Sequence, residues 1–191
     1  VFSLLRLSLV LALVLTGQGV VQTCAPNTTV TTLEGPGQVL PLGPAASQIA
    51  IKQLGTNGGG FFGVNSAHPF ENPTPLSNFL EMLAILLIPA AQTCTFGILI
   101  GRRRHGWALF AAMLLLVLGG FAVAWWAETS TPPVAGLSAW MEGKETRFGV
   151  MNSVLWGTAT SAAAAGSVNA MHDSLSPLPG VIRRLTSRDG E

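Results

Sequence analysis

The stretch Gly55-Thr56-Asn57-Gly58-Gly59-Gly60-Phe61-Phe62-Gly63 decides the fold that this sequence predicts. It follows a short helix-like segment, and Val64-Asn65-Ser66-Ala67-His68 comes directly after it. A second segment, Ala164-Ala165-Gly166-Ser167, is followed by the related run Val168-Asn169-Ala170-Met171-His172. The chain therefore contains an internal repeat. Irregular backbone at bilayer depth is tolerated only where it is buried in protein or lines a water-filled path, so this repeat between apolar stretches indicates part of an ion pore.

The composition is typical of a membrane protein. Of the 191 residues, 10% are charged and 49% are hydrophobic, whereas soluble domains carry roughly 25% charged residues. The mean hydropathy is +0.49. The formal net charge of +1 and the lack of a basic stripe argue against nucleic-acid binding. Cys24 falls in an expected exterior loop and Cys94 in an expected membrane helix, so we expect neither a disulfide nor a zinc site.

Three stretches approach the roughly 20 apolar residues that are needed to cross a bilayer. They are residues 1–21, 76–100 and 107–127. The first stretch has an alternative interpretation, because Arg6 followed by a leucine-valine run also resembles a secretory signal peptide.

The basic residues predict the orientation of these spans. Arg102, Arg103 and Arg104 lie in the connection between the second and third spans, which the positive-inside rule places in the cytoplasm. Residues 22–75 and 128–180 are then outside. Trp125 and Trp126 end the third span, where an interfacial aromatic belt is expected.

Two further helical stretches are too short or too polar to span the membrane. They are 47–55, with Ser47 as its start, and 148–163. We interpret both as re-entrant pore helices, followed by filter segments at 56–60 and 164–167. A helix C-terminus carries roughly half a negative charge, which favours a dehydrated cation at mid-membrane. Glycine lets successive carbonyls converge on one axis, where they can replace the hydration shell of a cation.

Other motifs in the chain have competing interpretations. Gly58, Gly60 and Gly63 match the dinucleotide-binding pattern G-x-G-x-x-G, but neither the preceding strand nor the following helix is expected there. His68 and His172 follow the two filter segments, where we expect them to brace the loops by hydrogen bonds. Glu81 is a functional candidate because intramembrane acids are expensive. Its place near the start of a span also allows interfacial solvation.

The residue runs resemble a known family. The stretch 55–62, continued by Asn65-Ser66-Ala67-His68-Pro69-Phe70-Glu71-Asn72-Pro73-Thr74, is similar to the second pore loop of the potassium-binding subunit of Kdp-type potassium-transporting ATPases. Residues 141–150 and 170–174 look like the segments on either side of that family's third pore loop. The resemblance covers residues 1–176. It implies an all-α membrane protein built from potassium-channel-like units, each made of a membrane helix, a re-entrant pore helix, a filter loop and a membrane helix.

The resemblance also implies a division of the chain. Residues 1–106 correspond to a second pore repeat and residues 107–180 to an incomplete third one, while 181–191 form a divergent polar tail. It places potassium ligands, as backbone carbonyls, in both filter segments. These ligands are Thr56, Asn57, Gly58 and Gly59 in one loop, and Ala164, Ala165, Gly166 and Ser167 in the other.

Further implications of the resemblance concern partners and location. The family works in the inner membrane of bacteria and archaea as a multi-pass protein in contact with lipid, and it binds the potassium ion as its cargo. It has no catalytic site of its own, because a P-type ATPase partner subunit hydrolyses ATP, and small accessory membrane subunits complete the complex. The alternative is a non-transporting truncated remnant or a structural membrane piece. In either case no other metal and no nucleic acid is implied.

The filter interpretation predicts the effect of glycine substitutions. Replacing Gly58 or Gly166 should misplace filter carbonyls and weaken potassium affinity and selectivity. Substitutions at Gly143 should do much less.

Overall fold

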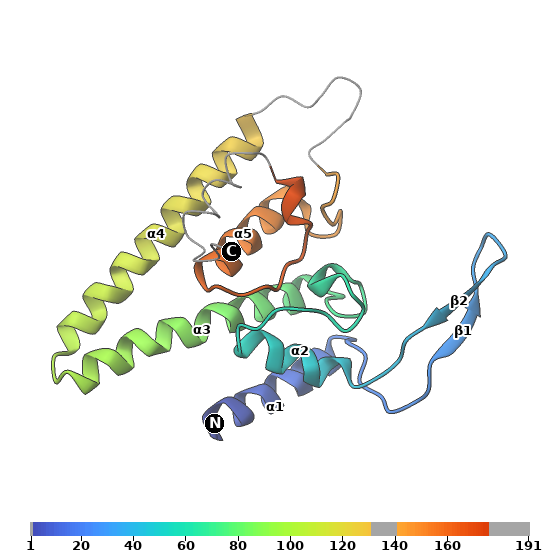
Figure 1. Ribbon diagram of the computed structural model, residues 1–191, viewed down its shortest axis with the longest axis horizontal. Helices are drawn as coiled ribbons and strands as arrows, with labels where there is room; N and C mark the ends of the chain where they lie inside the picture. The colour runs from blue at the N-terminus through green and yellow to red at the C-terminus, as the bar shows by residue number, and fades with distance from the viewer. Residues whose placement is uncertain (1, 131–140, 176–191) are drawn as a thin grey trace, which may run out of the picture.

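A computed structural model describes residues 2–130 and 141–175, and within these ranges the chain is mostly helical (Figure 1). The predicted tail at 181–191 lies outside the described residues. The helices are α1 (Phe2–Gly17), α2 (Ala45–Leu54), α3 (Pro75–Leu99), α4 (Arg103–Ser130) and α5 (Gly149–Ala162). The short 3-10 helices η1 (Asn65–Ala67) and η2 (His172–Ser174) and the strands β1 (Thr28–Thr31) and β2 (Gly37–Leu40) complete the described elements.

Two helices, α3 and α4, are long and apolar enough to cross a membrane. They contain 25 and 28 residues, and they cover the stretches 76–100 and 107–127 where the sequence predicts membrane helices. The start of α3 is fixed by a capping box, in which Thr74 and Ser77 satisfy each other's backbone N–H groups, and by Pro75 in the first turn. α4 begins earlier than expected, so Arg103 and Arg104 lie in its first turn rather than in a loop.

A tight turn joins α3 to α4, and the two helices diverge from it with α5 between them (Figure 1). Gly101 adopts a positive φ of 71° in this turn. Beyond it the helices touch through Gly97 and Gly106, where a Cβ on Gly97 would lie 3.0 Å from the Cα of Gly106. Small residues at a helix contact let membrane helices approach closely. Here the two glycines allow α3 and α4 to touch next to the turn that joins them.

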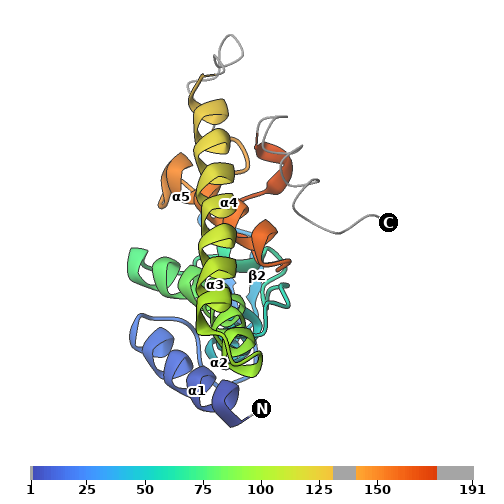
Figure 2. The same cartoon turned by 90° about the vertical axis from the view of Figure 1, so that its left-hand side faces the viewer.

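α1 is shorter than the expected span 1–21. It ends at Gly17, and Gly19 has a φ of 97°, which takes the chain out of the helix. α2 packs against α1 (Figure 2). The buried apolar residues of this contact are Leu15, Val20, Ala45, Ala46, Ile49 and Ala50.

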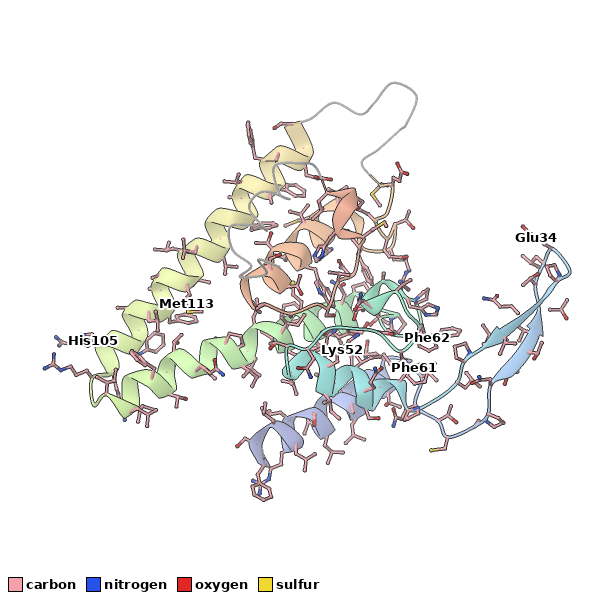
Figure 3. All side chains as sticks on the ribbon, in the orientation of Figure 1. Glu34, Lys52, Phe61, Phe62, His105 and Met113 are labelled. Carbon is pink, nitrogen blue, oxygen red and sulfur yellow. The ribbon has the colours of Figure 1, made fainter. Side chains whose placement is uncertain are left out.

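The expected exterior loop 22–46 contains a β-hairpin that the sequence interpretation missed. β1 and β2 pair antiparallel, with Thr28 opposite Leu40 and Thr31 opposite Gly37. The hairpin projects away from the helices, with Glu34 at its tip (Figure 3). α2 then begins at Ala45, two residues before the expected start at Ser47. Pro44 is the residue that precedes the helix, and Ser47 lies inside the first turn.

Candidate functional site

The two short helices α2 and α5 end in the same way. Each is followed by a non-glycine residue in the left-handed region, Thr56 with a φ of 53° and Ala164 with a φ of 50°. Two backbone hydrogen bonds across this residue make a Schellman motif at each end. The motif bonds are Asn57 to Lys52 (3.1 Å) and Thr56 to Gln53 (3.3 Å) after α2, and Ala165 to Thr160 (2.8 Å) and Ala164 to Ser161 (3.3 Å) after α5.

The loops that follow these helices meet at two glycines. Gly58 has a φ of 81°, and a Cβ placed on it would lie 2.4–2.7 Å from the main-chain atoms of Gly166. A Cβ on Gly166 would meet Gly58 and the Asn57 carbonyl oxygen only at 3.5 Å. A side chain at position 58 would therefore clash with the other loop, whereas a Cβ at position 166 would make only ordinary van der Waals contact. The contact brings two of the eight predicted ligand positions together across the repeat.

Side chains of α5 hold two carbonyls of the second loop. Thr160 Oγ1 donates to the Ala165 carbonyl at 2.8 Å, and Trp156 Nε1 donates to the Ser167 carbonyl at 2.9 Å. Thr160 and Trp156 are fully buried. The sequence interpretation missed both residues, although their spacing of four places them on one helix face. Within the described residues, the Ala164 and Gly166 carbonyls accept no hydrogen bond from a side chain of α5.

The first loop is fastened by a buried ion pair. Lys52, in the last turn of α2, lies 2.8 Å from Glu71 Oε2, and both side chains are almost completely buried. The other carboxylate oxygen of Glu71 accepts the backbone N–H of Phe62 at 3.1 Å. Figure 3 shows Lys52 on α2 beside the loop that carries Phe61 and Phe62. Glu71 thus ties the end of α2 to the segment of the loop that carries Phe62.

A second carboxyl extends this network into α3. Ser66 Oγ donates to Glu81 Oε2 at 2.6 Å, and Gln53 Nε2 donates to the same oxygen at 2.8 Å. Glu81 has no exposed surface. Interfacial solvation, one of the two interpretations of Glu81, is therefore wrong, since its side chain is enclosed by α2 and η1.

A second buried ion pair lies at the end of α4. Lys144 Nζ lies 2.7 Å from Glu128 Oε1 at the end of α4, and both side chains are fully buried. Lys144 also donates to the Ser174 carbonyl at 2.7 Å. Beside it, Gly143 has a φ of 69°, and a Cβ on it would lie 2.6 Å from the Cβ of Ser174. A side chain at Gly143 would therefore strain this segment, whatever its effect on potassium affinity.

Polar contacts join the two halves of the chain. The Arg147 guanidinium donates to the main-chain carbonyls of Asn72 at 2.7 Å and Ala67 at 2.9 Å. Asn78 Oδ1, on α3, accepts from Asn72 at 3.1 Å and from Asn169 at 2.9 Å. The Arg147 and Asn169 contacts cross 75 to 91 residues of sequence, so the two loops are held in one polar assembly.

His68 braces the first loop, as expected from its position. Its Nδ1 accepts the backbone N–H of Phe70 at 3.1 Å, and its ring stacks on Phe62 at a centroid distance of 4.4 Å. Partial burial lowers the pKa of His68 from its ordinary value, against the opposing influence of the nearby Glu71 carboxylate. The neutral ring, with its proton on Nε2, therefore fits this loop.

Acidification should loosen the loop through His68. Because the pKa of His68 is lower in the folded chain than the ordinary value of 6.5, stability is retained above about pH 6.5 and falls as the unfolded state takes up a proton below it. We expect the thermal midpoint in detergent to drop between about pH 7.5 and 5.5, and to drop less in His68→Asn. His105→Asn, at an exposed site, is the control and should drop as the unchanged chain does. Equal drops in both variants would remove His68 from the explanation.

Comparisons with known proteins agree on one family. A family profile described as potassium-transporting ATPase A subunit matches residues 1–186. Three relatives named potassium-transporting ATPase potassium-binding subunit align with the whole chain. They come from Leptospira interrogans (strain Fiocruz L1-130; 51% identical over 190 residues, 34% of its length), Herpetosiphon aurantiacus (52% over 212 residues, 37%) and Pseudomonas syringae pv. tomato (55% over 195 residues, 35%). The chain spans about a third of the length of these relatives.

Proposed function

Because the chain belongs to the potassium-transporting ATPase A subunit family, we propose that it forms part of the potassium-binding and translocating subunit of an ATP-driven potassium uptake system. The single observation that carries this proposal is the meeting of the two loops at Gly58 and Gly166, each directly after a short helix with the same Schellman end. Helix C-termini favour cations, and two such ends converge here.

The proposed site uses backbone carbonyls as potassium ligands. In the first loop these belong to Thr56, Asn57, Gly58 and Gly59. In the second loop they belong to Ala164, Ala165, Gly166 and Ser167, and the Ala165 and Ser167 carbonyls also accept hydrogen bonds from Thr160 and Trp156. Carbonyl rings replace the hydration shell of potassium, and two loops contribute part of such a ring. α2 and α5 serve as re-entrant pore helices in this proposal.

The proposal extends to location and partners. α3 and α4 cross the inner membrane of a bacterium or archaeon in contact with lipid, and the turn at Arg102 faces the cytoplasm by the positive-inside rule. The loops at Gly58 and Gly166 then open to the outside. ATP is hydrolysed by a P-type ATPase partner subunit, and small accessory membrane subunits complete the assembly. The chain itself is not an enzyme.

A chimera tests this function. We expect a relative's subunit in which this segment replaces the matching third to support growth at low potassium, in cells that lack other potassium uptake. The chain produced alone should not, because selective conduction needs a closed ring of ligands. The relative's unchanged subunit is the positive control. A chimera that reaches the membrane but takes up no potassium would favour the alternative of a non-transporting structural piece. Growth supported by the chain alone would show that two loops suffice.

A further inference from the structure

Glu81 and Gln53 each have a buried oxygen that lacks a hydrogen-bond donor. Glu81 Oε2 accepts from Ser66 and Gln53, but Glu81 Oε1 has no partner among the described residues. Gln53 Oε1 is likewise unpartnered within this part of the chain. Both side chains have no exposed surface, so a donor from bulk water does not reach them. Two orphaned acceptors therefore occur in one hydrogen-bonded acid–amide pair.

The charges around Glu81 do not balance an ionised carboxylate. Lys52 from α2 and Glu71 from the segment before α3 are the charged groups that face it among the described residues, and α5 carries no charged side chain. Lys52 is already paired with Glu71 at 2.8 Å, and its next contact, at 3.4 Å, is the Ser66 hydroxyl. A buried carboxylate without its own cation is strongly disfavoured.

We propose that Glu81 is a neutral carboxylic acid whose proton sits on Oε1 and is donated to Gln53 Oε1. The Gln53 amide donates to Oε2 in return, so acid and amide form a closed pair of two hydrogen bonds. One proton then satisfies both orphaned oxygens and removes the uncompensated charge. No other bond is made or broken. The network holds one ammonium at Lys52, one carboxylate at Glu71 and one neutral acid at Glu81.

This pair makes Glu81 a positioning residue for the first loop. The Gln53 carbonyl accepts the N–H of Thr56 in the Schellman motif, so fixing the Gln53 side chain to α3 also fixes the point where the loop begins. A neutral pair does this without adding a second negative charge beside the proposed cation path. Its importance for transport rests on the proposed function, but its protonation does not.

Infrared spectroscopy of the purified chain in detergent tests the proton directly. We expect the carbonyl stretch of a buried protonated carboxyl at about pH 7.5, where exposed carboxyls are ionised. The band should disappear in Glu81→Gln and remain in Glu145→Gln, which changes an acid that is about a third exposed. A spectrum without the band would overturn the proposal, because Glu81 would then be ionised. A band that survives in Glu81→Gln would also overturn it, because the band would then come from another carboxyl group.

A matched pair of substitutions gives a second, independent readout. Glutamine reproduces a neutral acid that accepts at one atom and donates at the other, so Glu81→Gln should keep the thermal midpoint of the chain, whereas Glu81→Ala should lower it. Glu71→Gln is the matched control, because the same change at a lysine-paired carboxylate should lower the midpoint. Destabilisation of Glu81→Gln to the level of Glu81→Ala would contradict a neutral acid.

In the chimera, Glu81→Gln should keep potassium uptake. Failure of the unchanged chimera would count against the proposed function alone.

Discussion

Replacing Glu71 by alanine will destabilise the chain by about 3–5 kcal/mol, which is the usual cost of leaving one partner of a buried ion pair alone. The change removes the carboxylate that pairs with Lys52 at 2.8 Å and that accepts the Phe62 N–H. Lys52 stays buried on α2 without a counter-charge, and the Phe62 N–H of the first loop loses its acceptor. Denaturant or thermal unfolding in detergent measures the loss.

Glu145→Ala is the matched control for this result. Glu145 pairs with Arg147 at 3.0 Å, but both side chains are about a third exposed, so the change should cost about 0–1 kcal/mol. Equal losses in the two variants would show that burial does not distinguish these pairs. The Lys52–Glu71 pair would then not be what fastens the loop.

Substituting alanine for Gly58 should weaken potassium affinity of an assembled transporter by at least about tenfold, since overpacking costs about 1–3 kcal/mol and the left-handed backbone adds about 1–2 kcal/mol. The new Cβ would lie within 2.7 Å of three main-chain atoms of Gly166. Backbone atoms cannot give way as a flexible side chain does, so the two loops must separate. Concentration-dependent uptake of potassium, with rubidium as competitor, measures the effect.

Two other glycines separate the causes of this loss. Gly166→Ala should have a smaller effect, because its Cβ would meet its nearest atoms at 3.5 Å. This asymmetry refines the equal effects expected from sequence. Gly119→Ala, in α4, has no atom within 4 Å of the added carbon and replaces Gly143 as the neutral comparison. An unchanged affinity in Gly58→Ala, or a larger loss in Gly166→Ala, would contradict the close approach of the loops.

The parts of the fold that sequence predicted are those set by local pattern. Apolar length located α3 and α4, and short helical segments before glycine-containing loops located α2 and α5 to within a few residues. The hairpin of β1 and β2 was missed because its threonines and valines face solvent on both sides, so no alternation of apolar residues marks it.

The side-chain contacts that hold the two loops in place could not be predicted in the same way. The partner of Lys52 lies 19 residues away and the carbonyl that Arg147 contacts lies 75 residues away, and neither spacing follows from a helix or strand period. The hydrogen bonds from Trp156 and Thr160 depend on how the loop returns along α5. The burial of Glu81 likewise depends on α2 packing over the start of α3. Such contacts follow from tertiary packing and not from residue type.

The Arg147 contacts have a consequence for how this protein can diverge over evolution. The guanidinium binds the carbonyl oxygens of Ala67 and Asn72, and every amino acid presents the same oxygen at those places. Mutations at Ala67 that keep the backbone path can therefore accumulate without loss of the contact, whereas Arg147 itself has no substitute, since lysine lacks the planar fork that reaches two carbonyls at once. At this contact, selection therefore falls on Arg147 and not on the residues whose carbonyls it binds.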